Sequence, residues 1–253
     1  MIREALATYG RNFRVFLLAS CLLCLPVEGI NQVQAVITVH GGWAFSTAAE
    51  VMLQLAGTFA FIVTGAALTI LAADLQTGGH WGWRGAWSRA LVRTRPVVTG
   101  YLAFILLVAT PAFFIVYTYL SSKSDLPQIP TSIVLPGIGL LLCPLSSLIA
   151  PVATVESRGG FGSAGRIWRL LRTSFRWRAT AALVLVNVPA LFAHTAFTAL
   201  WPGHPTVARW FGTAMVMLSN PVIVLVALAV YRRARAEQEP FTDAELRSTL
   251  NAI

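Results

Sequence analysis

The chain alternates between long apolar stretches and short polar connections. Six apolar stretches are long enough to cross a hydrocarbon core of about 30 Å, which takes about 20 helical residues. They lie near residues 15–38, 48–73, 97–120, 131–154, 179–201 and 208–231. This pattern predicts an all-α, polytopic integral membrane helical bundle with six transmembrane helices.

The overall composition supports a membrane protein. Of the 253 residues, 56% are apolar and only 11% are charged, whereas about 25% of the residues of a soluble domain are charged. The mean hydropathy is +0.68.

Basic residues distinguish the two sides of the predicted bundle. Of the 19 lysines and arginines, only Lys123 and Arg209 lie on the side of the connections that follow spans one, three and five. All the others precede span one, follow span six, or lie in the connections after spans two and four. By the positive-inside rule, both termini are predicted to be cytoplasmic, in a multi-pass protein of a bacterial inner (plasma) membrane.

Basic amphipathic interfacial helices are predicted before spans 1, 3 and 5. The clearest covers residues 164–176, where four arginines recur at spacings of three and four, opposite an apolar stripe. The arginines are Arg166, Arg169, Arg172 and Arg176, and the stripe consists of Ala164, Trp168, Leu171 and Phe175. Such a helix presents its cationic face to lipid headgroups, so anionic lipids are predicted partners. For the copy before span 3, a basic flank that merely sets orientation is the alternative.

The net charge of +9 raises the question of a nucleic-acid partner. The arginines flank apolar runs rather than forming one patch. No nucleic-acid partner is therefore predicted, and anionic lipid is favoured.

Polar residues inside the predicted spans are the best site candidates. Glu28, Asn31, Glu50, Gln54 and His194 share the outer half of the predicted bundle. An ionised side chain at the bilayer centre is costly, so a residue such as Glu28 should face protein or water. A cation, proton or substrate site open to the outside is one interpretation. Interhelical hydrogen bonding, with Glu28 protonated, is the other.

The sequence contains no recognisable enzyme motif. Cys21, Cys24 and Cys143 all lie inside apolar runs, where a free cysteine behaves as a small hydrophobic residue. No catalytic, cofactor-binding or metal-binding residues are predicted, and no cofactor.

Span four is predicted to be central. Gly139, Cys143 and Ser147 recur at spacings of four along it, and a stripe of small residues lets another helix approach closely.

A short tail follows the membrane domain. The chain divides into a six-span domain over residues 1–236 and a cytoplasmic tail over 237–253. Thr242 and Glu245 have the spacing of a capping box, which predicts a helix over about 243–251. This helix is expected either to lie against the membrane face or to dock a partner.

One part of the chain resembles a known family. In "LPGIGLLLCPLSSLIAPVATVESRGGFGSAGRIWRLLRTSF" (135–175), the features concerned are Pro136-Gly137-Ile138, the Ala-Pro-Val before Glu156, the glycines after it, and the basic stretch ending at Phe175. The opening "IREALATYGRNFRVFLL" is similar to the family's start. These segments resemble a broad bacterial family of six-span membrane domains, which includes the membrane region of some glycerophosphodiester phosphodiesterases. The resemblance implies a polytopic fold with interfacial helices. It implies no catalytic residues, because a phosphodiesterase domain would need a soluble barrel with acidic and His ligands.

These observations favour a non-enzymatic integral membrane subunit of a bacterial membrane assembly, concerned with transport or export. Its partners would be other membrane subunits or a cytoplasmic ATPase docked on the large basic connections. A stand-alone transporter using the intramembrane Glu/Asn/His cluster is one alternative. A lipid-binding membrane scaffold, acting through its basic helices, is another.

Overall fold

The computed structural model describes residues 1–22, 29, 43–79, 82–111, 114, 131–172, 176–201, 203–239 and 242–251. Within these ranges the chain is helical and contains no strand, so the all-α prediction is confirmed for the described part. The long helices are α3 (Trp43–Gln76), α7 (Thr131–Glu156), α9 (Arg176–Leu200) and α10 (Pro205–Gln238). They coincide with the second, fourth, fifth and sixth predicted spans. The first and third predicted spans lie partly outside the described residues.

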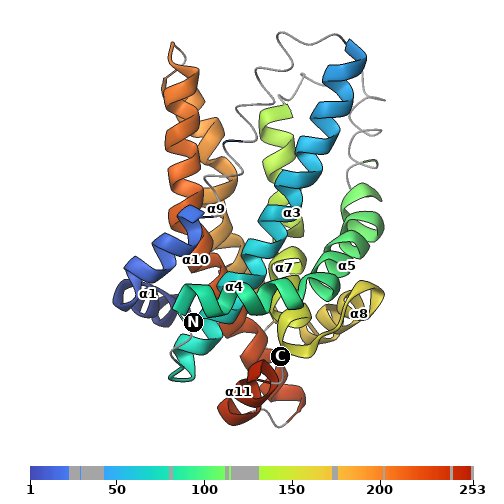
Figure 1. The fold of residues 1–253 in the computed structure, drawn as a ribbon, viewed down its shortest axis with the longest axis vertical. Helices are drawn as coiled ribbons and strands as arrows, with labels where there is room; N and C mark the ends of the chain where they lie inside the picture. Colours follow the sequence, from blue (N-terminus) through green and yellow to red (C-terminus); the bar gives the residue numbers. More distant parts are fainter. Residues whose placement is uncertain are drawn as a thin grey trace.

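Shorter helices complete the described fold. They are α1 (Ile2–Arg11), a helix at Phe13–Leu22, α4 (Gly82–Val92), α5 (Thr94–Phe104), α8 (Gly160–Leu170) and α11 (Asp243–Asn251). The π-helix η1 (Ile105–Ala109) continues α5. In Figure 1 the long helices run roughly along the vertical axis, α1, α4 and α8 lie across the lower half, and α11 lies at the bottom. Both marked termini are near this lower end.

Length and apolarity make some of these helices candidates for crossing a membrane. Leu55–Gln76 and Trp210–Gln238 span 22 and 29 residues and meet both criteria. The pair Gly82–Val92 and Thr94–Ala109, bent by 66°, would be a third candidate if it forms one span. The described part of the chain therefore has two or three helices compatible with a membrane protein.

The bundle is assembled around α7, as the small-residue stripe predicts. This helix contacts α3, α5, α8, α9, α10 and α11. Cys143, Ala150 and Ala153 on α7 are buried, and the facing part of α3 is rich in buried alanines. Small side chains allow close contact between helix backbones. The buried hydroxyl of Thr154 donates to the Ala150 carbonyl at 2.6 Å, so this polar group is satisfied within its own helix.

The connection between α7 and α8 passes very close to the start of α5. A Cβ placed on Gly159 would lie 2.9 Å from the Cα of Pro96 and 2.2 Å from the Thr99 hydroxyl oxygen. Only glycine therefore fits at this position. The close approach brings α8 back against α5 and α7.

The C-terminal helix is confirmed in its position and in its cap. The Thr242 amide donates to the Glu245 carboxylate at 2.9 Å, and the Glu245 amide donates to the Thr242 hydroxyl at 3.3 Å. Leu246 and Leu250 are buried, and α11 packs on α3 and α7. The proposed domain boundary at 236/237 falls inside α10, which continues to Gln238.

Candidate functional site

A cavity of about 260 Å³ lies among α3, α5, α7, α9 and α10. It is at the level of the middle of α3 and α10, since Gly65 and Asn220 both line it. Its walls are mainly apolar, with a few hydroxyl and amide groups on different helices. The polar lining residues are Thr69, Tyr101, Ser146, Ser147, Asn187 and Asn220. We call this the central cavity.

Hydrogen bonds within and between helices hold polar groups of the central cavity in place. The Asn187 amide nitrogen donates to the Leu183 carbonyl at 2.7 Å and to the Ser147 hydroxyl at 3.3 Å, which links α9 to α7. The Thr69 hydroxyl donates to the Gly65 carbonyl at 2.7 Å. A Cβ added to Gly65 would lie 3.8 Å from the Tyr101 hydroxyl oxygen, an ordinary contact distance, so this part of α3 lies next to the phenol. Amides and hydroxyls held on apolar walls are typical of sites for small organic ligands.

At the lower end of the bundle, an ion-pair network joins α7, α8 and α10. The Arg166 Nε donates to both oxygens of Glu156, at 2.9 and 3.0 Å. Its terminal nitrogens lie 2.9 and 3.0 Å from the two carboxylate oxygens of Glu239. The Tyr231 hydroxyl donates to Glu156 at 3.1 Å and accepts from Arg235 at 2.8 Å. One guanidinium thus bridges two carboxylates that are far apart in the sequence.

The network overturns part of the predicted basic helix. Arg166 was expected on an exposed cationic face, but its side chain is only 4% exposed. Its guanidinium forms ion pairs with two carboxylates. It is therefore not placed to contact lipid headgroups. The helix also ends at Leu170, so Arg176 belongs to α9 instead. The physical reason is that the buried carboxylate of Glu156 and the partly exposed carboxylate of Glu239 compensate the guanidinium charge, which a residue-by-residue polarity pattern does not reveal.

The remaining arginines of the predicted headgroup set are exposed. Arg169, Arg172 and Arg176 point out of the packed core. The guanidinium carbon of Arg172 lies 5.4 Å from the centre of the Trp168 ring, a cation–π distance. Trp168, a member of the predicted apolar stripe, is 56% exposed. Contact of these three arginines with lipid remains a prediction.

Ion pairing in the network shifts the pKa values of Arg166 and Glu239. Burial by itself lowers the pKa of Arg166, but hydrogen bonds to Glu156 and Glu239 raise it above its ordinary value. The same hydrogen bonds from Arg166 lower the pKa of Glu239. A carboxyl group with a lowered pKa stabilises the fold above its ordinary pKa, and this contribution is lost as the pH falls through the lowered value. The link to Glu239 should therefore weaken only in acid.

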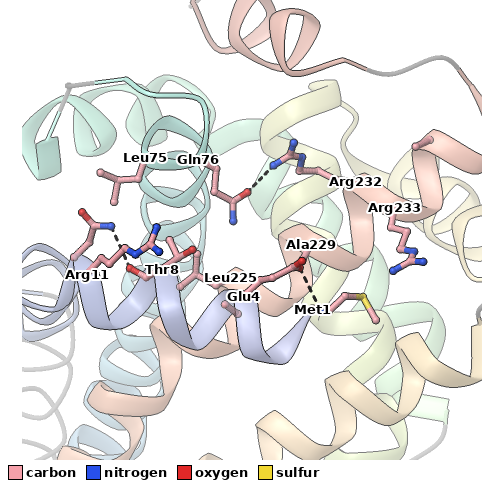
Figure 2. Close-up of a pocket in the computed structure, with 13 residues that line it drawn as sticks. Met1, Glu4, Thr8, Arg11, Leu75, Gln76, Leu225, Ala229, Arg232 and Arg233 are labelled. Atoms are coloured by element: carbon pink, nitrogen blue, oxygen red, sulfur yellow. Dashed lines mark hydrogen bonds and ion pairs between the residues drawn. The ribbon is translucent and has the colours of Figure 1, made fainter.

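A second cavity, of about 610 Å³, lies between α1 and the lower ends of α3 and α10 (Figure 2). Arg11, Arg232 and Arg233 line it, with Glu4 as the acidic residue among the described lining. Arg232 donates to the Gln76 side chain at 2.9 Å and also pairs with Asp243. We call this the arginine cavity.

The side chains of the predicted intramembrane polar site lie outside the described residues. Glu28 and Asn31 lie outside the described residues. The backbones of Glu50 and Gln54 belong to α3 and that of His194 to α9, while their side chains are outside the described set. Whether these five residues meet remains a prediction. Among the described residues, no three His, Cys, Asp or Glu side chains form a group suited to a metal ion.

Sequence reasoning missed how the central cavity and the ion-pair network assemble. Asn187 and Asn220 are visible as isolated polar residues in apolar runs, but nothing in the sequence aligns them with Ser147 and Tyr101. A signal did exist for the network. Glu156 is a lone carboxylate at the end of a long apolar run and directly before the arginine-rich stretch.

Fold and cavities together define an all-helical protein with helices compatible with membrane insertion. Comparisons with protein-family models, curated proteins and solved structures gave no match to the chain. The resemblance to six-span membrane domains therefore stays a prediction.

Proposed function

We propose that this chain is a non-enzymatic, six-span subunit of a bacterial inner-membrane assembly concerned with transport or export. Both termini are cytoplasmic, and α1, α4 and α8 lie at the cytoplasmic membrane interface. The observation that carries the proposal is the central cavity. Transport sites are commonly found near the bilayer midplane between helices, as this cavity would be.

The chemistry of the central cavity indicates its kind of ligand. The described lining contains no side chain that is charged at neutral pH, and Tyr101 is its one titratable group. Burying an ion there would be costly without an opposite charge. A small uncharged or amphipathic molecule with hydrogen-bonding groups fits better. It would meet the amides of Asn187 and Asn220 and the hydroxyl groups, and place its apolar part against residues such as Leu191 and Val216.

The lower end of the bundle is suited to docking a partner protein. The ion-pair network fixes α8 to α7 and α10, and α11 packs onto the same end. A fixed surface of this kind, with Arg169 and Arg172 exposed beside it, favours docking of a soluble component such as an ATPase. The resemblance to six-span membrane domains supports the same overall proposal.

The topology has a direct test. A reporter that is active only outside the cytoplasm, fused after Ile253, should give no signal, because the basic connections favour the cytoplasmic side. The same reporter inserted at Gly203, in the connection between α9 and α10, should be active. An active reporter after Ile253 would contradict the topology.

The transport role is tested by filling the central cavity. Ala190 on α9 lines it, whereas Ala181 on the same helix is exposed. Cells that lack the protein would be complemented with the wild type, Ala190→Phe or Ala181→Phe, and their retained small solutes compared by mass spectrometry. The wild type and Ala181→Phe should restore the solute profile, while Ala190→Phe should not, at equal amounts of inserted protein.

Two outcomes would contradict this role. If deletion leaves the solute profile unchanged, the protein does not take part in transport of those solutes. If Ala190→Phe restores the profile fully, the central cavity is not where the solute binds.

A further inference from the structure

Two polar side chains in the described lining of the central cavity make no hydrogen bond. Thr69, Ser146 and Asn187 each donate to a backbone carbonyl of their own helix. Among the hydrogen bonds of the described residues, none involves the side chain of Asn220 or that of Tyr101. These two side chains are therefore free to bond a molecule in the cavity.

Asn220 lies deep within α10 and is only 9% exposed. It follows Trp210 by ten residues in the candidate span Trp210–Gln238, which places it about 15 Å along the helix from that end. A carboxamide buried without a partner is costly, and hydrogen bonds to a ligand would remove this cost. Because Asn220 borders the central cavity, a molecule bound there can supply those bonds.

The second free group, the Tyr101 hydroxyl, is contributed by α5. A Cβ added to Gly65 on α3 would lie 3.8 Å from the Tyr101 oxygen and 3.8 Å from the Cβ of Ala150 on α7. The phenol therefore lies where these three helices meet, and all three residues line the cavity. A phenol and a carboxamide can each donate and accept a hydrogen bond. They match a ligand group that does both, such as a hydroxyl or a carboxamide.

We propose that the central cavity selects a small uncharged molecule with a hydroxyl or carboxamide group on an apolar body, and that Asn220 and Tyr101 supply its hydrogen bonds. This inference rests on the proposed function of the cavity and adds the ligand class. The described lining holds no charged side chain, so a carboxylate, phosphate or ammonium group would be buried without compensation. The volume of about 260 Å³ is below the roughly 300–1,000 Å³ of pockets for drug-sized ligands, so the ligand is small.

Apolar side chains limit how polar the ligand can be. Leu191, Val216 and Ile223 line the cavity beside the two free polar groups. A molecule with many hydroxyl groups, such as a sugar, would lose hydrogen bonds to water that this lining does not replace. The cavity therefore favours a single polar group over several.

The test is NMR of the purified full chain in mild detergent, with asparagine selectively labelled with ¹⁵N. Benzyl alcohol, benzamide, toluene and benzoate would be titrated separately while the side-chain amide signal of Asn220 is followed. Benzyl alcohol and benzamide should shift this signal saturably. Toluene should bind at least about tenfold more weakly, because it leaves the polar groups unpaired, and benzoate should cause no shift. The Asn12 amide, which donates to the Thr8 carbonyl outside the cavity, should stay unchanged with every probe.

A hydroxyl deletion tests the role of Tyr101. In Tyr101→Phe, the apparent Kd for benzyl alcohol should rise about fivefold, as expected for the loss of one hydrogen bond. The matched control is Tyr9→Phe. Within the described part of the chain, the Tyr9 hydroxyl also has no hydrogen-bond partner, but Tyr9 does not line the cavity. Its replacement should change the apparent Kd by less than about twofold.

Several results would overturn the proposal. Equal affinity for toluene and benzyl alcohol would mean that the cavity binds apolar molecules without its polar groups. A benzoate shift at Asn220 as large as that of benzyl alcohol would contradict the selection of uncharged ligands, and no shift with either polar probe would contradict the site. These results need only the wild type, so they decide the matter even if Tyr101→Phe fails to fold. Equal weakening in Tyr101→Phe and Tyr9→Phe would exclude Tyr101 from recognition.

Binding and transport are separated by the two kinds of measurement. If the polar probes bind at Asn220 while Ala190→Phe leaves the cellular solute profile intact, the ligand class stands and the transport role fails. If Ala190→Phe abolishes the profile while neither polar probe shifts Asn220, the transport role stands and this ligand class is wrong.

Discussion

Replacing Arg166 with methionine should lower the free energy of unfolding by about 3–5 kcal/mol, because it leaves buried carboxylate without its main partner. The Glu156 side chain is only 7% exposed, and Arg166 is its closest cationic partner, at 2.9 Å. Glu239 loses a bidentate contact in the same variant. Thermal unfolding in detergent should show a midpoint lowered by roughly 10 °C.

Arg169→Met is the control for this prediction. Arg169 lies three residues away on the same helix, but its side chain is exposed. Its replacement should change the free energy of unfolding by no more than about 0.5 kcal/mol. If the two variants were equally destabilised, lost surface charge would explain the result and the network would not.

A second variant separates the buried charge from the lost packing. In Arg166→Met/Glu156→Leu, the carboxylate that would be left behind is removed as well. The double variant should recover at least about 1 kcal/mol relative to Arg166→Met, as expected for residues that interact directly. Additive losses would show that Glu156 and Arg166 stabilise the protein independently.

Replacing Leu246 with alanine should release α11 from the bundle. Leu246 is fully buried, and truncating such a leucine costs about 2–5 kcal/mol. α11 has nine residues, too few to stay helical in water on its own. Amide hydrogens in α11 should therefore exchange about thirtyfold faster or more, as measured by hydrogen–deuterium exchange.

Arg247→Ala is the matched control, because Arg247 is the adjacent residue and is exposed. Exchange in α11 should stay within about threefold of the wild type. Fast exchange in the wild type, or none of the expected increase in Leu246→Ala, would mean that burial of Leu246 does not hold α11 in place.

Several elements could be predicted because their causes are local. The long helices follow from continuous apolar runs, and the start of α11 follows from Thr242 and Glu245, which bond each other across a single turn. The many contacts of α7 were expected from small residues spaced by one turn, since these form a stripe along which another helix can approach closely. Each of these predictions depends only on residues that are close to one another in the sequence.

Other features could not be predicted, because they depend on residues brought together from distant parts of the chain. Periodicity placed Arg166 outside, on the general ground that a charged residue avoids the interior. Glu156 and Glu239 reverse that expectation, since they lie 10 and 73 residues away in the sequence and only the fold puts them beside the guanidinium.

By itself, then, the sequence determined that the chain is helical, where its described long helices run, how α11 is capped and that α7 is central. These properties depend on local hydrogen bonding and on apolar runs. Only the tertiary structure decided that Arg166 is buried, that Asn187, Asn220 and Tyr101 border one cavity, and that Arg11 and Arg233 border another. The reason is that charge compensation and cavity shape depend on distances between helices, and a linear pattern of polar and apolar residues does not contain those distances.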